Sequence, residues 1–150
     1  MSVIESIIDV PANLEKNVFG QFDSNIKKIE KTLHVTIISR NGELKIIGQE
    51  VAAKRAKGVF SNLIELANRG NEITEQNVDY ALSLSYDNKE SAILELDSDI
   101  ICRTIMGKPI KPKTLGQKKY VDLIKNKMIV FGIGPAGTGK TYLAMAMAIT

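Results

Sequence analysis

The first seventy residues alternate short apolar runs with longer segments in which apolar positions recur every three or four residues. The short runs predict strands over residues 2–9, 34–39 and 44–47. The longer spacing predicts helices over residues 13–18, 24–33 and 50–68. An Asn-Gly pair at residues 41 and 42 predicts a tight hairpin between the last two strands. The predicted order is therefore strand, helix, loop, helix, strand, strand, helix.

This βααββα order resembles the KH-like fold, in which a G-x-x-G loop between two helices clamps a nucleic-acid backbone. Here the loop is Gly-Gln-Phe-Asp over residues 20–23, so a carboxylate replaces the last glycine. Asp23 would repel a phosphate and hinder its close approach. Three bases on the following helix supply partial compensation: Lys27, Lys28 and Lys31. Residues 1–70 are expected to form a KH-like module that either binds RNA or serves in docking and assembly.

Residues 71–113 are expected to form a connector, acidic at first and then basic, with a short helix over 74–84 and a strand over 100–105. Eight acids and one base lie between Asn71 and Asp99, whereas eight bases and one acid lie between Arg103 and Lys127. Two interpretations remain open. The blocks form solvated faces that attract each other, or the basic strip meets the phosphates of a nucleotide or a nucleic acid.

The sequence from Met128 to Thr150 has the order of a phosphate-binding motif. An apolar, β-branched run over 128–133 predicts a buried parallel strand, and a helix-forming segment occupies 142–149. Between them, residues 134–141 fit G-x-x-x-x-G-K-[ST], the Walker A pattern. Residues 114–150 are therefore expected to begin a P-loop domain built on a parallel sheet.

Each residue type in the motif has a distinct part in holding phosphate. Glycines allow the backbone N–H groups to converge on an anion, and the following helix adds its positive dipole end. Lys140 would neutralise the β- and γ-phosphates, and the hydroxyl of Thr141 would bind Mg²⁺. The residues expected to form the site are Gly134, Pro135, Ala136, Gly137, Thr138, Gly139, Lys140 and Thr141.

Several parts of a complete nucleoside-triphosphatase domain do not follow the loop. The sequence has one short helix after it, without a Walker B aspartate, a water-positioning residue or an arginine finger. We therefore expect this chain to be the N-terminal part of a longer protein. By itself it is expected to bind part of a nucleotide and to be inactive in hydrolysis.

Upstream of the loop, Pro109 and Pro112 predict an extended arm that leads into an amphipathic helix capped by Thr114. Gln117 lies in the first turn of that helix. Its carboxamide carries both a donor and an acceptor, as reading an adenine edge requires. On chemistry alone, a surface glutamine on an amphipathic helix is the favoured interpretation.

Composition excludes several classes of protein. The chain has 150 residues, of which 44% are apolar and 25% charged, as is typical of a globular protein. No apolar run reaches the roughly 20 residues needed to cross a bilayer, and the N-terminus does not have the pattern of a secretory signal. A cytoplasmic location without membrane contact is expected, and the single cysteine, Cys102, suits a reducing compartment. Neither Cys102 nor the lone histidine, His34, has sequence neighbours that would form a zinc or nucleophile site.

Several of these motifs together resemble the PhoH family of bacterial ATPases. The resemblance rests on Thr-Leu-Gly-Gln at 114–117, Tyr-Val at 120–121, and Val-Phe-Gly-Ile-Gly-Pro-Ala-Gly-Thr-Gly-Lys-Thr-Tyr-Leu-Ala at 130–144. Near the N-terminus, Phe-Gly-Gln-Phe-Asp-Ser-Asn-Ile-Lys-Lys-Ile-Glu at 19–30 is similar to the family's own N-terminal module.

The resemblance implies a cytoplasmic ATP- and Mg²⁺-binding protein with a RecA-type core like that of superfamily 1 helicases. It also implies a link to RNA metabolism and, by name, to phosphate starvation. In that setting Gln117 resembles the adenine-reading glutamine of helicase-type ATPases. The implied partners are RNA or an RNA-processing protein, and the oligomeric state stays open, a homo-oligomer included.

Three functional hypotheses remain. The first is an ATPase whose nucleotide cycle drives work on RNA or on a partner protein. The second is a non-catalytic RNA-binding or adaptor protein in which the nucleotide is structural. The third, a small-molecule P-loop kinase, leaves the N-terminal module unexplained.

Overall fold

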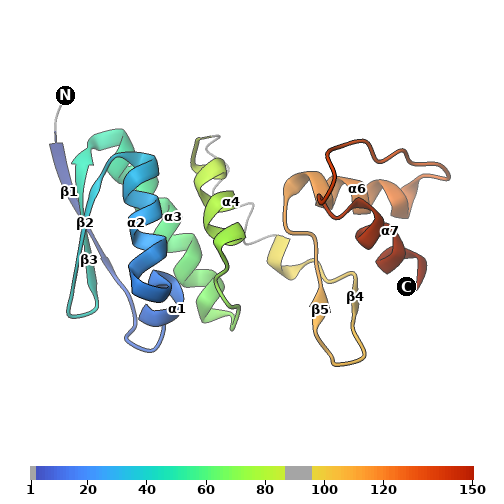
Figure 1. The fold of residues 1–150 in the computed structure, drawn as a ribbon, viewed down its shortest axis with the longest axis horizontal. Helices are drawn as coiled ribbons and strands as arrows, with labels where there is room; N and C mark the ends of the chain where they lie inside the picture. The colour runs from blue at the N-terminus through green and yellow to red at the C-terminus, as the bar shows by residue number, and fades with distance from the viewer. Residues whose placement is uncertain (1–2, 87–95) are drawn as a thin grey trace. The chain divides into compact units, whose positions relative to one another are not determined.

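The computed structural model describes residues 3–86 and 96–150 of this mixed α/β chain (Figure 1). The chain divides into two compact units, residues 1–91 and residues 92–150. Each unit has its own buried residues, so the two are described separately below.

The first unit has the order of elements that the hydrophobic pattern predicts, with one more helix at its end. The elements of the predicted part are β1 (Val3–Asp9), α1 (Glu15–Phe19), a 3₁₀ turn η1 (Gln21–Asp23), α2 (Ser24–Leu33), β2 (Thr36–Arg40), β3 (Glu43–Gln49) and α3 (Glu50–Asn68). The additional helix is α4 (Glu75–Tyr86).

The strands form an antiparallel sheet in the order β1-β3-β2. Asn41 and Gly42 join β2 to β3 with φ values of 53° and 82°, the left-handed pair that a tight hairpin needs. This turn fixes the register, which places Ile37 opposite Ile46. Since side chains alternate across a strand, that register directs both isoleucines to the same face.

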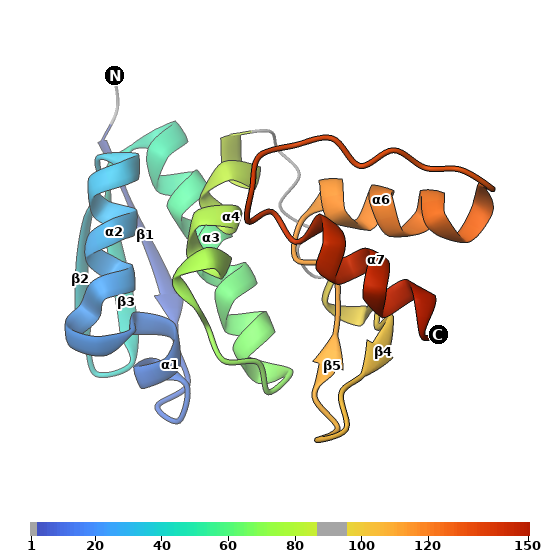
Figure 2. The ribbon, with the colours of Figure 1, turned by 45° about the vertical axis from the view of Figure 1, so that its right-hand side comes forward.

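One face of this sheet is covered by helices and the other is open (Figures 1 and 2). Leu44 and Ile46 of β3 are fully buried beneath α2 and α3, together with Ile29 and Phe60 of those helices. On the other face, side chains such as that of Ile7 are exposed. The core of the first unit therefore lies on one side of the sheet.

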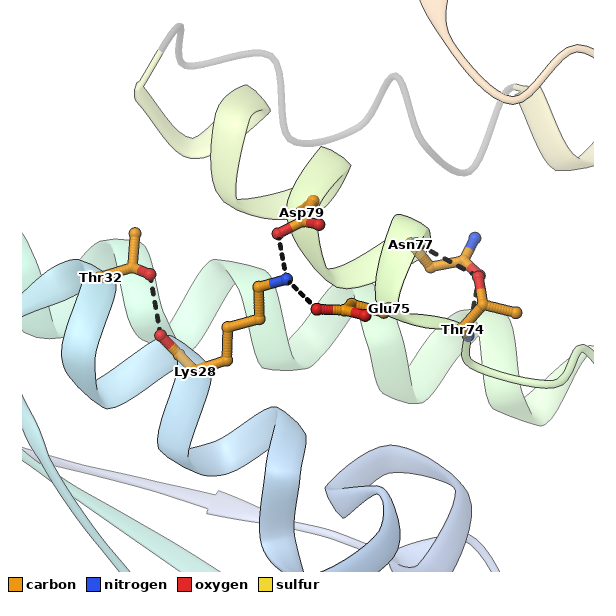
Figure 3. Close-up of polar contacts among 6 residues, drawn as sticks. All are labelled: Lys28, Thr32, Thr74, Glu75, Asn77 and Asp79. Carbon is orange, nitrogen blue, oxygen red and sulfur yellow. Dashed lines mark hydrogen bonds and ion pairs between the residues drawn. The ribbon is translucent and has the colours of Figure 1, made fainter. Parts of the chain in front are cut away.

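Helix α4 packs against α2 and α3, so its contacts place it in the first unit, although the sequence analysis assigned it to the connector. Val78 is fully buried in this packing. The Lys28 ammonium on α2 lies 2.7 Å from a Glu75 carboxylate oxygen and 2.6 Å from one of Asp79 (Figure 3). The Asn17 side chain on α1 binds the segment before α4, donating to Asn71 O at 2.8 Å.

The second unit is small. A helical turn over 96–98 precedes β4 (Cys102–Arg103) and β5 (Pro109–Ile110), a two-stranded antiparallel ladder. Two helices follow, α6 (Leu115–Asn126) and α7 (Lys140–Ala148). Its buried core consists of Ile101, Val121, Leu143 and Ala146.

The prediction of a buried strand over residues 128–133 is wrong for this structure. The segment is not a strand, and the side chains of Met128, Phe131 and Ile133 are largely exposed. A strand requires neighbours that pair with its backbone, and no described residue pairs with this one. Both sheets formed by residues 3–86 and 96–150 are antiparallel, so the predicted parallel sheet is not observed.

Three further points compare the structure with the sequence analysis. The strand predicted over 100–105 shortens to the two residues of β4. Part of the acidic block, residues 87–95, lies outside the described residues. In the part of the chain that the structure describes, no helix is both long and apolar enough to cross a bilayer.

The ion pairs of Lys28 predict a pH-dependent stability. The hydrogen bonds that the Lys28 ammonium donates to Asp79 and Glu75 hold the pKa of Lys28 above its usual 10.5. Their contribution is therefore present below pH 10.5 and is lost as pH rises through the higher folded-state pKa. Lys28→Met should lower the free energy of unfolding by about 0.5 kcal/mol at pH 7. In urea titrations the difference from the parent should shrink above pH 10.5.

Lys54→Met is the matched control for this prediction. Lys54 pairs with Glu50 one helical turn away on the same helix, so it links no two elements. Its substitution should have a smaller effect on stability. A Lys28→Met difference that persists undiminished at pH 12 would contradict the assignment to the ion pairs.

Candidate functional site

The glycine-rich loop over 134–139 leads directly into α7, which begins at Lys140. Gly137 and Gly139 have φ values of 77° and 79°, in the left-handed region where a side chain is strained. No side chain caps the N-terminus of α7, whose Leu143 N–H donates to Gly139 O at 2.9 Å. The loop therefore presents the start of a nine-residue helix without a side-chain cap.

The ammonium of Lys140 lies inside the loop. It donates to the carbonyls of Gly134 at 2.9 Å and Pro135 at 2.6 Å, and to the Thr138 hydroxyl at 2.9 Å. The Thr138 hydroxyl in turn donates to Pro135 O at 3.0 Å. An ammonium has three protons, so all three are engaged by loop acceptors. The loop thus closes around one full positive charge.

Thr141 follows Lys140 in the first turn of α7 and is exposed. Among the described residues its hydroxyl has no hydrogen bond, so it is available to a ligand beside the loop. The structure therefore brings the two residues predicted to contact phosphate and metal to adjacent positions at one helix end.

Gln117 also reaches this loop, although twenty-one residues separate it from its contact. Its Nε2 donates to Thr138 O at 3.2 Å, and its Oε1 accepts from Lys113 N at 2.6 Å. The Thr114 hydroxyl accepts from Gln117 N at 3.2 Å and caps α6 as predicted. A Cβ on Gly139 would lie 3.3 Å from Gln117 Nε2, so the glycine permits this approach. The carboxamide retains a second N–H and a second lone pair.

The sequence analysis missed a contact of Tyr120, since it named this residue only as part of the family resemblance. A Cβ on Gly132 would lie 3.1–3.2 Å from atoms of the Tyr120 ring. The Tyr120 ring therefore packs so closely on Gly132 that a side chain at this position would require the ring to shift. Gly132 lies within the bulky apolar run over 128–133, and this small residue was the sign in the sequence of a close contact.

Acidic residues pair with part of the basic strip. Asp97 lies 2.6 Å from the Lys111 ammonium, and Asp99 lies 2.7 Å from that of Lys118 and 3.9 Å from that of Lys125. The hydrogen bond from Lys118 holds the pKa of Asp99 below its usual value. These contacts match the interpretation in which the acidic and basic blocks attract each other.

In the first unit, the turn over 20–23 has a backbone unlike an ordinary helix connection. Phe22 and Asp23 have φ values of 53° and 58°, and the Phe22 side chain is 90% exposed. Lys27 donates to Phe22 O at 2.9 Å, whereas Lys28 pairs with the acids of α4. Of the three lysines expected to compensate for Asp23, Lys28 is thus already neutralised.

The sequence analysis assigned no chemistry to His34 or Cys102, which lie in different units. His34 is exposed in a left-handed conformation at the end of α2, and Cys102 is a half-buried free thiol in β4. Within residues 3–86 and 96–150, no group of three histidine, cysteine or acidic side chains gathers around a common point where a metal ion would fit.

The family model and the similar proteins carry the same description. Residues 109–150 match the family model described as "PhoH: PhoH-like protein". A "PhoH-like protein" of Mycobacterium tuberculosis strain H37Rv is 41% identical over 147 residues, which cover 97% of this chain and 41% of that protein. The Bacillus subtilis strain 168 "PhoH-like protein" is 38% identical over 133 residues, 89% of this chain and 42% of that protein.

A more distant "PhoH-like protein" from Synechocystis is 28% identical over 130 residues, 87% of this chain and 40% of that protein. The chain therefore spans about two fifths of the length of the curated relatives it matches. No solved structure matches the chain significantly.

The Asp99 contacts predict a measurable titration. The carboxyl of Asp99 should titrate below 3.8, its usual value, in a ¹³C NMR titration of the parent protein. In Lys118→Met the strongest cause of the shift is removed, so the pKa should rise towards 3.8. Lys119→Met, one residue along α6, should leave the titration unchanged. Equal pKa values in the parent and Lys118→Met would contradict the contact.

Proposed function

The chain belongs to the PhoH-like protein family, and on that premise we propose that it binds ATP together with Mg²⁺ through the loop from Gly134 to Thr141. The observation that carries the proposal is the position of Lys140, whose ammonium lies among the loop acceptors at the uncapped start of α7. A triphosphate in that place would meet one full positive charge and the positive end of a helix dipole.

The residues present fit both groups. The open space beside Gly137, where an added Cβ would have no neighbour within 4 Å, leaves room for phosphate at the loop backbone. Lys140 would exchange its bonds to Gly134 O and Pro135 O for phosphate oxygens. The exposed Thr141 hydroxyl is a suitable ligand for Mg²⁺, which prefers oxygen donors. The cation would shield the negative charge of the phosphates.

Gln117 is proposed to contact the adenine. The contact to Thr138 O brings its carboxamide to the edge of the loop, beside the phosphate-binding residues. Its remaining N–H and lone pair match the acceptor and donor that adenine presents side by side. Gln117 would then donate one Nε2 proton to the loop and offer the other Nε2 proton, with the free lone pair of Oε1, to the base.

ATP turnover is proposed for the full-length protein. Besides Lys140 and Thr141, hydrolysis requires a Walker B acid for the metal, a group that positions water and an arginine finger, and none of the residues described above is assigned to these three tasks. This chain would contribute the binding half of such a site. RNA-stimulated ATP turnover by the full-length protein would favour an ATPase, and binding without turnover would favour the adaptor hypothesis.

The first unit is proposed to be a KH-like module that contacts RNA or docks a partner. Supporting features are the antiparallel order β1-β3-β2 and a turn between α1 and α2 that exposes Phe22. Exposed aromatic rings stack on unpaired bases, and the neighbouring Lys27 and Lys31 are exposed cations. The proposed role of this KH-like module does not depend on the proposed nucleotide site.

Lys140→Ala should abolish ATP binding by the full-length protein, because it removes the charge inside the loop. Isothermal titration calorimetry measures the affinity directly. Lys127→Ala removes an exposed lysine outside the loop and should leave the affinity unchanged. ATP affinity that survives Lys140→Ala would refute the assignment of the loop.

Gln117→Ala should weaken ATP binding about tenfold, since a lost hydrogen-bonded contact costs about 1.4 kcal/mol. Tripolyphosphate has no base, so its affinity should fall much less. The ratio of the two dissociation constants is the quantity to measure. An equal loss for both ligands would show that Gln117 serves the loop and not the base.

Asp23→Gly should tighten binding of a fluorescent oligouridine to the full-length protein about threefold, by removing a charge that opposes phosphate. Asp23→Asn is the matched variant, because it removes the same charge and tolerates the left-handed backbone. Anisotropy titrations at one fixed salt concentration compare them. If neither variant changes the affinity, the turn is not an RNA contact and the docking alternative is favoured.

A further inference from the structure

Two aspartates, two residues apart, hold the segments on either side of Gln117. Asp97 contacts Lys111 at 2.6 Å, and these side chains are only 13% and 21% exposed. Lys111 belongs to the extended arm and lies two residues before Lys113, whose N–H donates to Gln117 Oε1. The ion pair between Asp97 and Lys111, here called the first anchor, therefore fixes the arm whose Lys113 N–H binds Gln117.

Asp99 forms the second anchor, on α6. Its Oδ2 lies 2.7 Å from the ammonium of Lys118, the residue directly after Gln117, and its Oδ1 lies 3.9 Å from that of Lys125. The Asp99 side chain is 20% exposed, which limits screening of these charges by solvent. One carboxylate thus reaches two positions about two helical turns apart on α6.

The Gln117 side chain, between these two ion pairs, keeps its position through two hydrogen bonds. This side chain has three rotatable bonds, so holding it in one conformation costs rotamer entropy. It stays at the loop only while Lys113 N and Thr138 O both remain in reach, at 2.6 and 3.2 Å. A shift of the arm relative to α6 would break the first of these contacts.

We propose that Asp97 and Asp99 are positioning residues that hold the Gln117 carboxamide at the phosphate-binding loop. This inference rests on the proposed nucleotide site and adds residues to it. The two aspartates touch neither base nor phosphate. They act through Lys111 and Lys118, which fix the arm and the helix against each other.

If Asp97 and Asp99 had a purely structural role, a different experimental result would be expected than for positioning residues. If the aspartates only stabilise the second unit, their removal weakens every ligand of the loop alike. If they position Gln117, the loss concerns ligands with a base, and it disappears once Gln117 itself is removed. The ratio of tripolyphosphate to ATP affinity therefore separates the two roles.

The experiment compares the full-length parent with the double variant Asp97→Asn/Asp99→Asn by calorimetry with ATP and with tripolyphosphate. The double variant should lose about tenfold in ATP affinity relative to tripolyphosphate, the same loss that is expected for Gln117→Ala. In a Gln117→Ala background the same two substitutions should change the ratio no further. Asp99→Glu should retain most of the parent ratio, because it keeps the carboxylate.

Asp122→Asn is the matched control. It makes the same change of charge on α6, at a carboxylate that forms no ion pair among the described residues. It should leave the ratio at the parent value. A double variant with the parent ratio, or a further loss in the Gln117→Ala background, would overturn the proposal.

A ligand-free measurement keeps this test separate from the proposed function. Exchange of the Lys113 amide hydrogen, which Gln117 Oε1 protects, should accelerate in the double variant and in Gln117→Ala but not in Asp122→Asn. Unchanged exchange in the double variant would overturn the positioning role whether or not ATP binds. A parent protein that binds neither ATP nor tripolyphosphate would instead refute the proposed function.

Discussion

The loop between Gly134 and Thr141 depends on one cation. The Lys140 ammonium uses its three protons to join the carbonyls of Gly134 and Pro135 to the Thr138 hydroxyl, and so folds the loop around itself. Its pairing with neutral acceptors leaves the positive charge uncompensated. Because the loop ends at an uncapped helix start, the same point also receives the positive end of the α7 dipole. A group with several negative oxygens would replace the carbonyls at little cost, and a triphosphate is such a group.

Charge pairing organises the rest of the second unit and part of the first. Asp97 and Asp99 neutralise lysines on the arm and on α6, and Glu75 and Asp79 neutralise Lys28 on α2. The cations beside a proposed contact surface that pair with no acid within residues 3–86 and 96–150 are then the ones available to phosphate. In the first unit they are Lys27 and Lys31, next to the exposed Phe22. In the second unit, Lys140 in the loop pairs with neutral acceptors among the described residues and so keeps its positive charge uncompensated. This distribution is consistent with two contact surfaces for phosphate groups on one chain.

Local patterns predicted the first unit well, since alternation and helical spacing depend on neighbouring residues. The Asn41-Gly42 hairpin is the clearest case, because its left-handed backbone follows from those two residue types. The buried strand over 128–133 was wrong, because an apolar run becomes a strand only when other strands lie beside it. The contacts of Asp97 and Asp99 were missed for another reason. Asp97 pairs with Lys111, 14 residues away, and Asp99 pairs with Lys118, 19 residues away. Counting charges along the sequence shows that the two blocks attract each other, but it does not show which residues pair. Whether Gln117 meets a base stays a prediction.

The most direct test of this account is a structure of the full-length protein with a non-hydrolysable ATP analogue and Mg²⁺. The account predicts the triphosphate inside the loop, with Lys140 Nζ moved from Gly134 O and Pro135 O to phosphate oxygens and Thr141 on the metal. An analogue bound elsewhere, with Lys140 still on the two carbonyls, would contradict it.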